Sequence, residues 1–413
     1  MRILYLTQWF EPEPAFKGIA FARALADRGH EVEVATAFPN YPGGKLYPGY
    51  RLKLHQRDII DGIVIHRNFV LPSHDKSSIG RAANYLSFWL SALVFGLLRG
   101  GRYDVIYVYH PPITPALAAA WFCRLWRRPF VLEIQDLWPD SVVSSGMAGG
   151  QDHWLVRLLG RLCCDVYRRA TMIVAQSDGI KTRLIARGVP MDKIERIYNH
   201  STFVLAEPAD SAPEEVRAAF ADRLNLVYGG NLGQAQALGT VIEAIAIARQ
   251  RHPTLHLHLF GGGVESNCLI AQAKRLGIAQ HVSFHGPVQR TVMDRIFDLA
   301  DILVLHLKDD PLYEITIPSK TQHYLSCAKP IIAGLSGEAA GILLSSGAAR
   351  LTAPGDAQAM ADAMADLAAM SSAELAALGG KGRRYYEANL AFGRAVDSTL
   401  AVIEKAVDRY LPS

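Results

Sequence analysis

Residues 311–333 of this chain read Pro-Leu-Tyr-Glu-Ile-Thr-Ile-Pro-Ser-Lys-Thr-Gln-His-Tyr-Leu-Ser-Cys-Ala-Lys-Pro-Ile-Ile-Ala. The segment predicts a loop that carries Glu314, a helix that starts at residues 317–320 and ends near residues 328–330, and a buried strand from Ile331. Proline near the first helical position is favourable, because the first backbone N–H groups of a helix have no intrahelical partner. A loop, a helix and a strand in this order are typical of an α/β domain.

The start of this predicted helix carries groups that suit a sugar diphosphate. Free backbone N–H groups and the ammonium group of Lys320 would bind the diphosphate, and the carboxylate of Glu314 would bind sugar hydroxyl groups. An ordinary loop, helix and strand with an incidental lysine and glutamate fits the same spacing about equally well. The choice between the two interpretations depends on the rest of the chain.

The rest of the chain repeats the alternation of strands and helices. The predicted strands are residues 3–7, 31–35, 63–68, 105–109, 130–134 and 172–175, then 224–228, 255–260, 282–285, 302–305 and 330–333. The predicted helices include residues 18–27, 239–250, 268–276, 292–299 and 357–369. Such alternation indicates parallel sheets with right-handed crossovers, and it places ligands at the carboxyl ends of the strands.

The chain has 413 residues, which favours two domains over one. We expect an α/β fold with two doubly wound parallel-sheet (Rossmann-like) domains that face a cleft. The predicted domains are residues 1–199 and 200–382, and the second begins with a linker at residues 200–222 that is rich in alanine, proline and acidic residues. Residues 383–413 follow as one or two helices.

The composition is that of a folded globular protein, with 50% hydrophobic and 20% charged residues. The cysteines show no C-x-x-C spacing, which predicts buried, reduced thiols in a cytoplasmic protein and no zinc site. They are Cys123, Cys163, Cys164, Cys268 and Cys327. The sequence also lacks the P-loop, H-E-x-x-H and G-x-S-x-G motifs, so three common classes of hydrolase are not favoured.

The first half of the chain is basic and contains an apolar segment. Residues 1–199 hold 25 Lys and Arg against 17 Asp and Glu, a net charge of +8 within a total of +4. Residues 82–98 carry no charge, which predicts either a buried helix or a membrane-associated one. Basic and aromatic residues follow, and they favour attachment to an anionic membrane surface over nucleic acid binding. They are Trp121, Phe122, Arg124, Trp126, Arg127, Arg128, Arg157, Arg161 and Arg168.

Several loops at predicted strand ends carry candidate binding groups. Lys17 and Gly18 open the first helix and could hold a phosphate or a sugar acceptor. His110 ends a predicted strand, which raises its chance of a functional role above that of an ordinary loop histidine. The glycine-rich turns at residues 229–233, 261–263 and 286–287 end successive strands of the second half, and together they predict a nucleotide site there.

These motifs together resemble those of the family 4 GT-B glycosyltransferases, and the most similar type is the bacterial capsule, O-antigen and colanic-acid enzymes. The resemblance covers essentially the whole chain. The motifs are Gly29-His30-Glu31-Val32, Phe38-Pro39-Asn40-Tyr41-Pro42, Asp136-Leu137-Trp138-Pro139-Asp140, Gly229-Gly230-Asn231-Leu232-Gly233, Ile317-Pro318-Ser319-Lys320 and Lys329-Pro330-Ile331-Ile332.

The resemblance implies a retaining transfer of a hexosyl or N-acetylhexosaminyl group from a UDP- or GDP-sugar, with no metal and no other cofactor. The donor would bind the second domain. The acceptor, a polyprenyl-diphosphate-linked glycan, would bind the first domain at the cytoplasmic face of the membrane. A C-terminal helix would cross back onto the first domain.

The candidate site residues follow from the motifs and the resemblance. The candidate catalytic residues are His110, Lys320 and Glu314. The candidate donor-binding residues are Gly229, Gly230, Asn231, Gly233, Gly261, Gly262, Pro287, Val288, Pro318, Ser319, Lys320, Gln322 and His323. The candidate acceptor-side residues are Phe16, Lys17, Gly18, Asn40, Tyr41, Asp136 and Trp138.

The chain departs from the family pattern at the ribose contact and beside the glycine turn. The family commonly has a second glutamate with seven residues between it and the first, a spacing that leads from Glu314 to Gln322, whereas alignment on Pro318-Ser319-Lys320 puts His323 at that position. Gln234 and Gln236 replace the usual basic residue after the glycine turn, so Lys320 would carry more of the diphosphate charge. Two alternatives to a transferase stay open: a nucleotide-sugar 2-epimerase of the same architecture, and a non-catalytic partner in polysaccharide assembly.

Overall fold

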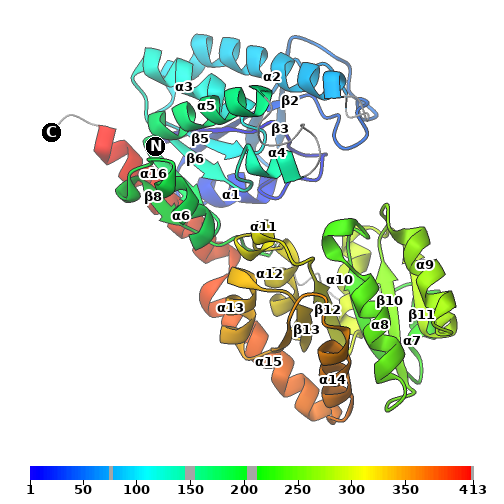
Figure 1. The fold of residues 1–413 in the computed structure, drawn as a ribbon. Helices are drawn as coiled ribbons and strands as arrows, with labels where there is room; N and C mark the ends of the chain where they lie inside the picture. The colour runs from blue at the N-terminus through cyan, green and yellow to red at the C-terminus, as the bar shows by residue number, and fades with distance from the viewer. Residues whose placement is uncertain (74–77, 145–153, 202–211, 411–413) are drawn as a thin grey trace. The chain divides into compact units, whose positions relative to one another are not determined.

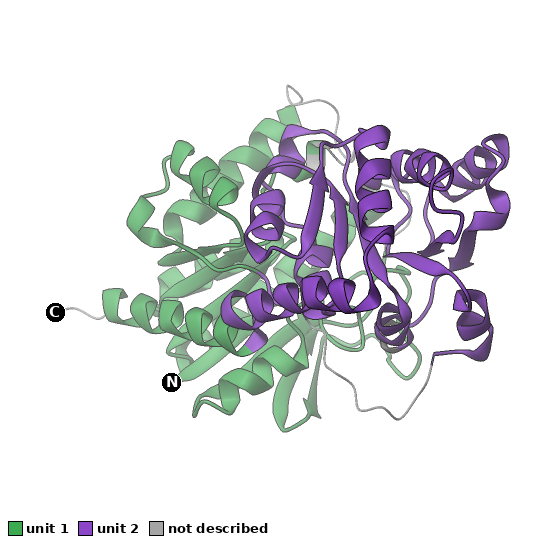
Figure 2. Cartoon of the chain, turned by 90° about the horizontal axis from the view of Figure 1, so that it is seen from below, with its two compact units in different colours: residues 1–198, 393–413 green, residues 199–392 purple. Residues whose placement is uncertain are grey.

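The computed structural model describes residues 1–73, 78–144, 154–201 and 212–410. The chain forms two compact units (Figures 1 and 2). Unit 1 comprises Met1–Tyr198 and Gly393–Ser413, and unit 2 comprises Asn199–Phe392. The chain therefore passes from unit 1 into unit 2 and returns to unit 1 at its end.

Unit 1 is built on an eight-stranded sheet in the order β3-β4-β2-β1-β5-β6-β7-β8, in which every neighbouring pair is parallel except β3 and β4. The strands are β1 (Arg2–Leu6), β2 (Glu31–Ala37), β3 (His55–Ile60), β4 (Ile63–Asn68), β5 (Val105–His110), β6 (Phe130–Ile134), β7 (Met172–Ala175) and β8 (Ile194–Arg196). The helices are α1 (Ile19–Ala26), α2 (Ser78–Arg99), α3 (Thr114–Trp126), α4 (Asp140–Ser144), α5 (Trp154–Arg169), α6 (Asp178–Ala186) and α16 (Phe392–Tyr410).

The side chains of unit 1 divide between the two faces of this sheet, as strand geometry requires. Leu4 and Leu6 of β1 belong to the apolar core that α2, α3 and α5 cover, and these helices lie above the sheet in Figure 1. Tyr5 points to the opposite face, where its ring meets Phe21 of α1 at 5.7 Å and Tyr107 of β5 at 5.6 Å. Both faces of the central strands are therefore buried.

Unit 2 has a six-stranded parallel sheet in the order β11-β10-β9-β12-β13-β14. The strands are β9 (Leu224–Gly229), β10 (Leu255–Phe260), β11 (Val282–Gly286), β12 (Ile302–His306), β13 (Ile331–Gly334) and β14 (Ala349–Thr352). The helices are α7 (Glu214–Phe220), α8 (Gly239–Ala248), α9 (Ser266–Arg275), α10 (Arg290–Leu299), α11 (Pro311–Glu314), α12 (Ser319–Ser326), α13 (Gly337–Ser346), α14 (Ala357–Ala368) and α15 (Ser372–Asn389).

The strand orders locate the point at which each doubly wound sheet changes direction. In unit 1 this point lies between β1 and β5, and in unit 2 it lies between β9 and β12. Open α/β sheets bind their ligands at this point, beyond the carboxyl ends of the strands. In this chain Lys17 follows β1, His110 ends β5 and the glycine turn at residues 229–233 follows β9, whereas Lys320 lies in α12, the second helix after β12.

Helix α16 completes unit 1 from the far end of the chain. Its buried residues are Ala395, Val396, Thr399, Val402, Ile403 and Ala406. Salt bridges join it to unit 1 along its length, at Arg28–Asp397 (2.6 Å), Glu195–Lys405 (2.6 Å) and Asp192–Arg409 (3.0 Å). The predicted C-terminal helical segment, residues 383–413, is divided in the structure: residues 383–389 continue α15, which starts at Ser372, and the separate helix is α16.

The predicted and observed elements agree closely within both sheets, apart from several omissions. Strands β3, β8 and β14 were not predicted. Helix α7 lies within residues 200–222, which had been interpreted as a linker, and residues 202–211 of that stretch lie outside the described residues. Glu314 is the last residue of the short helix α11 and not part of a loop, and α12 ends at Ser326, earlier than predicted.

Two expectations about burial are wrong in part. Residues 82–98 do not form a buried helix, because only one face of α2 enters the core, with Phe88, Ala92 and Phe95. Its other face exposes Leu86, Leu90, Val94, Leu97 and Leu98. Gly80–Arg102, which comprises most of α2 and the turn after it, is by length and composition apolar enough to cross a membrane, and it is mostly not buried. Among the cysteines, Cys268 is exposed and Cys164 is half-buried, whereas the other three are buried as expected.

Candidate active site

Lys320 lies in the first turn of α12, next to the glycine turn that follows β9. Its ammonium group lies 5.1 Å from the ring centre of Tyr228, and a β-carbon on Gly230 would come within 2.6 Å of Lys320 Nζ. Burial lowers the pKa of Lys320 to about 8, because desolvation disfavours the charged form. Within the described residues the ammonium has no carboxylate partner, so an anionic ligand would supply the missing charge.

The N-terminus of α12 adds to this positive site. Pro318 is the N-cap residue, and no side chain caps the helix there. The N–H of Thr321 bonds to the carbonyl oxygen of Pro318 at 2.9 Å. The N–H groups of Ser319 and Lys320 have no such partner in the described structure. Free N–H groups in the first turn of a helix are the groups to which anions bind.

The glycine turns of unit 2 come together, but they do so for a reason that was not predicted. A β-carbon on Gly261 would lie 1.8 Å from the carbonyl oxygen of Gly230, and one on Gly263 would lie 2.3 Å from that of Leu232. These glycines therefore permit neighbouring turns to touch. Gly262 has open space around its α-carbon, so a ligand can approach its backbone.

Residues 230–233, which include predicted donor-binding residues, offer few free N–H groups to a diphosphate. The N–H of Gly230 bonds to Phe260 O at 2.8 Å, that of Leu232 bonds to Gly262 O at 3.0 Å, and that of Gly233 bonds to the side chain of Gln236 at 3.2 Å. Asn231 is the member of this group whose N–H has no partner among the described residues. Gly229 faces inward, and its N–H bonds to the Tyr324 hydroxyl at 3.2 Å. The positive field at this turn therefore comes mainly from α12.

The remaining donor-side candidates divide into accessible and internal residues. Glu314, Pro287 and Val288 are exposed. Gln322 is fully buried, and its amide nitrogen, assigned from its surroundings, donates to Pro318 O at 2.9 Å and to Ser319 O at 3.3 Å. His323 bonds to Ser201 Oγ at 3.2 Å and faces Asp294 at 3.3 Å. Gln322 and His323 are thus held by contacts within unit 2, and neither side chain is positioned as a free ribose ligand.

Unit 1 has a pocket of about 230 Å³ beyond the carboxyl ends of β1 and β5. Four predicted acceptor-side residues line it, namely Phe16, Lys17, Tyr41 and Asp136. Trp9, which was not predicted, stacks on Tyr41 with ring centres 4.6 Å apart and planes at 28°. An aromatic wall beside an exposed carboxylate suits a sugar ring, because the ring's C–H face packs on the aromatics and its hydroxyl groups bond to the carboxylate.

Lys17 and Gly18 do not bind the acceptor in the way that was expected. The side chain of Lys17 is 3% exposed, and its ammonium forms a salt bridge with Glu133 of β6 and donates to Tyr107 Oη at 3.0 Å. Gly18 leaves room for the carboxylate of Glu11, which accepts a hydrogen bond from Ile19 N at 2.8 Å at the start of α1. A carboxylate of the protein already occupies that helix N-terminus, which excludes a phosphate there.

Asn40 is also structural, although it lies close to the pocket. Its side chain donates to Phe38 O at 2.9 Å and accepts from Asn84 of α2 at 3.0 Å. The buried carboxylate of Glu13, which was not predicted, accepts hydrogen bonds from three backbone N–H groups. These are Phe10 N at 3.2 Å, Asn40 N at 2.6 Å and Tyr41 N at 2.7 Å. Glu13 therefore fixes Tyr41 in the pocket wall.

His110 ends β5, next to Pro111 in the pocket wall, and is fully buried. Desolvation lowers the pKa of its imidazole to about 3, so the ring is neutral at physiological pH. Neither ring nitrogen has a hydrogen-bond partner among the described residues. The indole of Trp138 meets the ring edge-to-face, with centres 5.6 Å apart. A buried donor and acceptor without partners are costly, which indicates that a ligand completes them.

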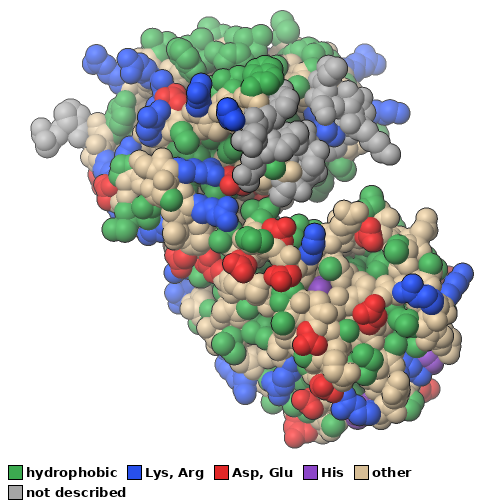
Figure 3. Space-filling view, viewed as in Figure 1, with side chains coloured by type: hydrophobic (Ala, Val, Ile, Leu, Met, Phe, Trp, Pro, Cys, Tyr) green, Lys and Arg blue, Asp and Glu red, His purple; other side chains and the backbone are tan. Residues whose placement is uncertain are grey.

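A broad apolar surface covers the outside of unit 1. Hydrophobic side chains gather over α2 and α3, with basic side chains at the margins (Figure 3). We call this the apolar-basic surface, and its exposed apolar members are Leu86, Leu90, Val94, Leu97, Leu98, Trp121, Leu125 and Trp126. Arg124 and Arg127 are exposed beside it, whereas Arg128 donates to Gly101 O at 3.0 Å and is half-buried. No group of three or more metal-ligating side chains occurs in the part of the chain that the structure describes.

Comparison with known proteins gives consistent matches. The model of the glycosyl transferase 4-like domain matches residues 20–200, and that of the glycosyl transferases group 1 matches residues 223–370. The putative colanic acid biosynthesis glycosyl transferase WcaI of Escherichia coli is 26% identical over 62% of this chain and 63% of its own length. A glycogen synthase of Mycobacterium tuberculosis is 22% identical over 75% of this chain and 73% of its own.

Solved structures match along nearly the whole chain. HepE of Anabaena, crystallised with UDP and glucose, has a TM-score of 0.70 at 18% identity and covers 98% of this chain and 100% of its own. WaaG, a glycosyltransferase involved in lipopolysaccharide biosynthesis, has a TM-score of 0.61 at 14% identity over the full length of both chains. At these identities the likeness shows the fold, with two α/β units of the GT-B type.

Proposed function

The chain belongs to the family 4 GT-B glycosyltransferases, and from this premise we propose that it transfers a sugar, with retention of configuration, from a nucleoside-diphosphate donor to a polyprenyl-diphosphate-linked glycan. The sugar is a hexosyl or N-acetylhexosaminyl group, and the nucleotide is UDP or GDP. The product belongs to a bacterial surface or extracellular polysaccharide. The colanic acid relative, and the complex of HepE with UDP and glucose, support this choice of donor and pathway class.

The proposal that the protein binds a nucleotide-sugar donor depends mainly on Lys320. Its desolvated ammonium at an uncapped helix N-terminus, with Gly230 beside it and open space at Gly262, matches the charge of a nucleoside diphosphate. In the transfer, the bond between the anomeric carbon and the diphosphate oxygen breaks, and the leaving diphosphate gains negative charge. Lys320 and the helix N-terminus stabilise that charge.

The acceptor half lies in the pocket of unit 1. A terminal sugar of the glycan stacks on Trp9 and Tyr41, and one of its hydroxyl groups attacks the anomeric carbon. Its proton passes to the departing diphosphate, so no side chain acts as a covalent nucleophile. His110 supplies a hydrogen bond to the donor sugar or the departing phosphate through a ring nitrogen that has no partner in the described structure.

The apolar-basic surface supports a place for the enzyme on the membrane. Exposed leucines and tryptophans flanked by arginines suit the interface between acyl chains and anionic head groups. A peripheral protein on the inner, cytoplasmic face of the plasma membrane would meet both the nucleotide sugar and the lipid-linked glycan there.

A transfer assay tests the proposal. The purified protein is incubated with a panel of UDP- and GDP-sugars, with and without prenyl-diphosphate-linked glycans, and the anomeric configuration of the product is read by NMR. We expect acceptor-dependent release of the nucleoside diphosphate and retention. An altered nucleotide sugar without acceptor would instead identify an epimerase. Donor binding without transfer across the acceptor panel would identify a non-catalytic partner.

A further inference from the structure

A groove with arginines in its walls lies on unit 1 between α4, α5 and α6. It consists of two adjoining pockets of about 310 and 440 Å³. Arg161 and Arg168 line one end, and Pro139 and Asp140 line the other. Both pockets share four lining residues, which are Arg157, Gly160, Cys164 and Arg187.

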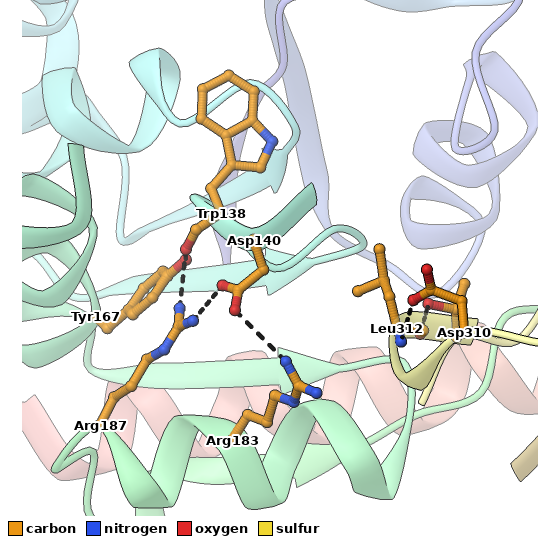
Figure 4. Close-up of polar contacts among 8 residues, drawn as sticks. Trp138, Asp140, Tyr167, Arg183, Arg187, Asp310 and Leu312 are labelled. Atoms are coloured by element: carbon orange, nitrogen blue, oxygen red, sulfur yellow. Dashed lines mark hydrogen bonds and ion pairs between the residues drawn. The ribbon is translucent and has the colours of Figure 1, made fainter. Parts of the chain in front are cut away.

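Positive charge dominates this arginine groove. Four arginines line it, whereas Asp140 is the single acidic side chain among the described lining residues. Asp140 is held by Arg187 and, at 3.4 Å, by Arg183 (Figure 4). Arg161 has no ion-pair partner in the described structure, and the contact of Arg168 with Asp165 is long, at 3.9 Å. The groove thus keeps guanidinium groups that its own carboxylate does not neutralise.

Helix α5 places this positive charge beside an apolar ridge. Arg157, Arg161 and Arg168 recur at intervals of four and seven residues, so they share one face of the helix. Trp154, Leu158 and Leu162 recur every four residues on the adjacent face, and all three are exposed. A ligand with an anionic head and an apolar chain would satisfy both faces at once.

One chain segment, residues 136–140, contributes lining residues to both the acceptor pocket and the groove. Asp136 lines the pocket, and Pro139 and Asp140, a few residues further along the same loop, line the groove. Arg187 fixes this loop, because its guanidinium donates to Trp138 O at 2.9 Å while it holds Asp140 (Figure 4). A ligand that extends along this segment would reach the pocket with one part and the groove with another.

We propose that the arginine groove binds the diphosphate group of the lipid-linked acceptor. This inference rests on the proposed function, and it adds the part of the acceptor that follows the sugar. The sugar lies in the pocket with Trp9 and Tyr41, the diphosphate lies between Arg161 and Arg168, and the prenyl chain leaves along Leu158 and Leu162. Guanidinium groups suit this task, since each can donate two parallel hydrogen bonds to phosphate oxygens.

A binding measurement tests the proposal without requiring any sugar transfer. The probe is farnesyl diphosphate in detergent, titrated by calorimetry into the full chain, with farnesol as the uncharged comparison. We expect the double variant Arg161→Gln/Arg168→Gln to bind farnesyl diphosphate about 100-fold more weakly, at about tenfold per lost charge-assisted contact. Arg57→Gln, on β3 of the same unit and also exposed, is the matched control and should bind like the natural protein.

Gly160→Leu provides a second test that does not depend on the folding of the arginine variants. A β-carbon at Gly160 would meet Pro139 at 3.7 Å, an ordinary contact, so the larger side chain enters the groove without displacing backbone. Leucine is also a better helix former than glycine, so α5 should become more stable. We expect farnesyl diphosphate binding to be lost at an unchanged or higher melting temperature.

A second measurement is the ratio of KM values for the sugar linked to farnesol through a diphosphate and for the same sugar as a plain farnesyl glycoside. The natural protein should favour the diphosphate form, and both groove variants should lose that preference. Unchanged farnesyl diphosphate binding in these variants would overturn the inference. The inference would also be overturned if farnesol bound as tightly as farnesyl diphosphate. It would be overturned as well if the groove variants lost binding only to anionic phospholipid vesicles, because the groove would then bind lipid head groups. The natural protein could also transfer sugar to neither acceptor while the groove variants still bind farnesyl diphosphate more weakly than it does. In that case the proposed function fails and the groove assignment stands.

Discussion

The side chain of Lys320 fills the space in which a β-carbon of Gly230 would lie, with both Cε and Nζ within 2.6 Å of that position. Gly230 also has a φ of +142°, a backbone conformation that side chains rarely adopt. The glycine turn after β9 and helix α12 are therefore matched to one another. The position of the ammonium depends on the absence of a side chain at residue 230.

Gly230→Ala should consequently impair catalysis through Lys320. The new methyl group displaces the end of the lysine side chain, and the strained φ adds a folding cost of about 1–3 kcal/mol. We expect a turnover loss of about tenfold or more with a modest fall in melting temperature. Gly341→Ala, in α13 with open space around it, controls for the general effect of the substitution. Equal turnover in both variants would separate Gly230 from the site.

Removal of the ammonium itself should cost more. Lys320→Ala should lower turnover by about 100- to 1000-fold, the usual effect of deleting one donor to a developing anion. The fold should survive, because the variant removes a buried charge that has no carboxylate partner in the described structure. Near-normal transfer with a stable fold would remove Lys320 from the mechanism.

Lys320 also predicts a pH dependence of stability. Its pKa is about 8 in the folded protein and 10.5 in the unfolded chain, so between these values the unfolded state binds more protons. The free energy of unfolding should therefore rise as the pH passes from 8 to 10.5, and be lowest, for this group, below 8. Donor kcat/KM should fall over the same range as the cation is lost. Denaturant titrations of the natural protein and of Lys320→Met measure the difference, and parallel curves would contradict it.

His110 should show opposite effects on stability and on turnover. Since neither ring nitrogen has a partner in the described structure, His110→Phe removes two unsatisfied polar atoms and should stabilise the fold by about 1 kcal/mol. Turnover should fall by about 10- to 100-fold, because the hydrogen bond to the reacting groups is lost. A purely structural histidine would give the reverse, with a lower melting temperature and normal turnover per folded molecule.

The Lys17–Glu133 pair gives a test that depends on stability alone. Lys17→Met leaves the carboxylate of Glu133 buried and without its cation, which should cost about 3–5 kcal/mol of unfolding free energy. Lys17→Met/Glu133→Gln should recover most of that loss, because no charge then stays buried. Denaturant unfolding of both variants measures the coupling. A small, additive effect would mean that the pair is not desolvated.

Membrane attachment is tested by charge placed within the apolar-basic surface. Leu98 is 75% exposed on α2, and Leu98→Glu/Leu125→Glu should abolish pelleting with anionic vesicles. Val264, 82% exposed in unit 2, provides the control Val264→Glu, which should pellet normally. Each arginine near the membrane surface contributes about 1 kcal/mol to binding, and salt screens this attraction, so binding should also weaken as the salt concentration rises. Salt-independent binding to neutral vesicles would indicate hydrophobic insertion of α2 instead.

Most of both sheets could be predicted because their strands are short apolar runs with clear ends. The predicted ranges 63–68, 130–134, 172–175 and 255–260 coincide with β4, β6, β7 and β10. Strand β3 was missed because its residues are mostly polar and it lies at the sheet edge. A usable signal was present, since Asp61 and Gly62, both at positive φ, form the two-residue turn typical of a hairpin between β3 and β4.

The candidate site was predictable where one segment carries it and not where distant residues combine. The position of Lys320 follows from its own helix start. The fate of Lys17 does not, because its partner Glu133 lies 116 residues away and only the sheet brings them together. Likewise, the glycine turns predict that another group lies close to their backbone. The sequence does not show whether that group is a ligand or a neighbouring turn.

The place of α16 has a consequence for how the protein is made. Helix α16 belongs to unit 1 and buries one of its faces, yet the ribosome must complete all of unit 2 before it makes this helix. At about 5–20 residues per second, the strands of unit 1 would wait roughly 10–40 s for their last partner. During that interval the part of unit 1 that α16 contacts stays exposed. Premature termination within α16 should therefore yield insoluble protein, although every residue assigned to the active site has already been synthesised.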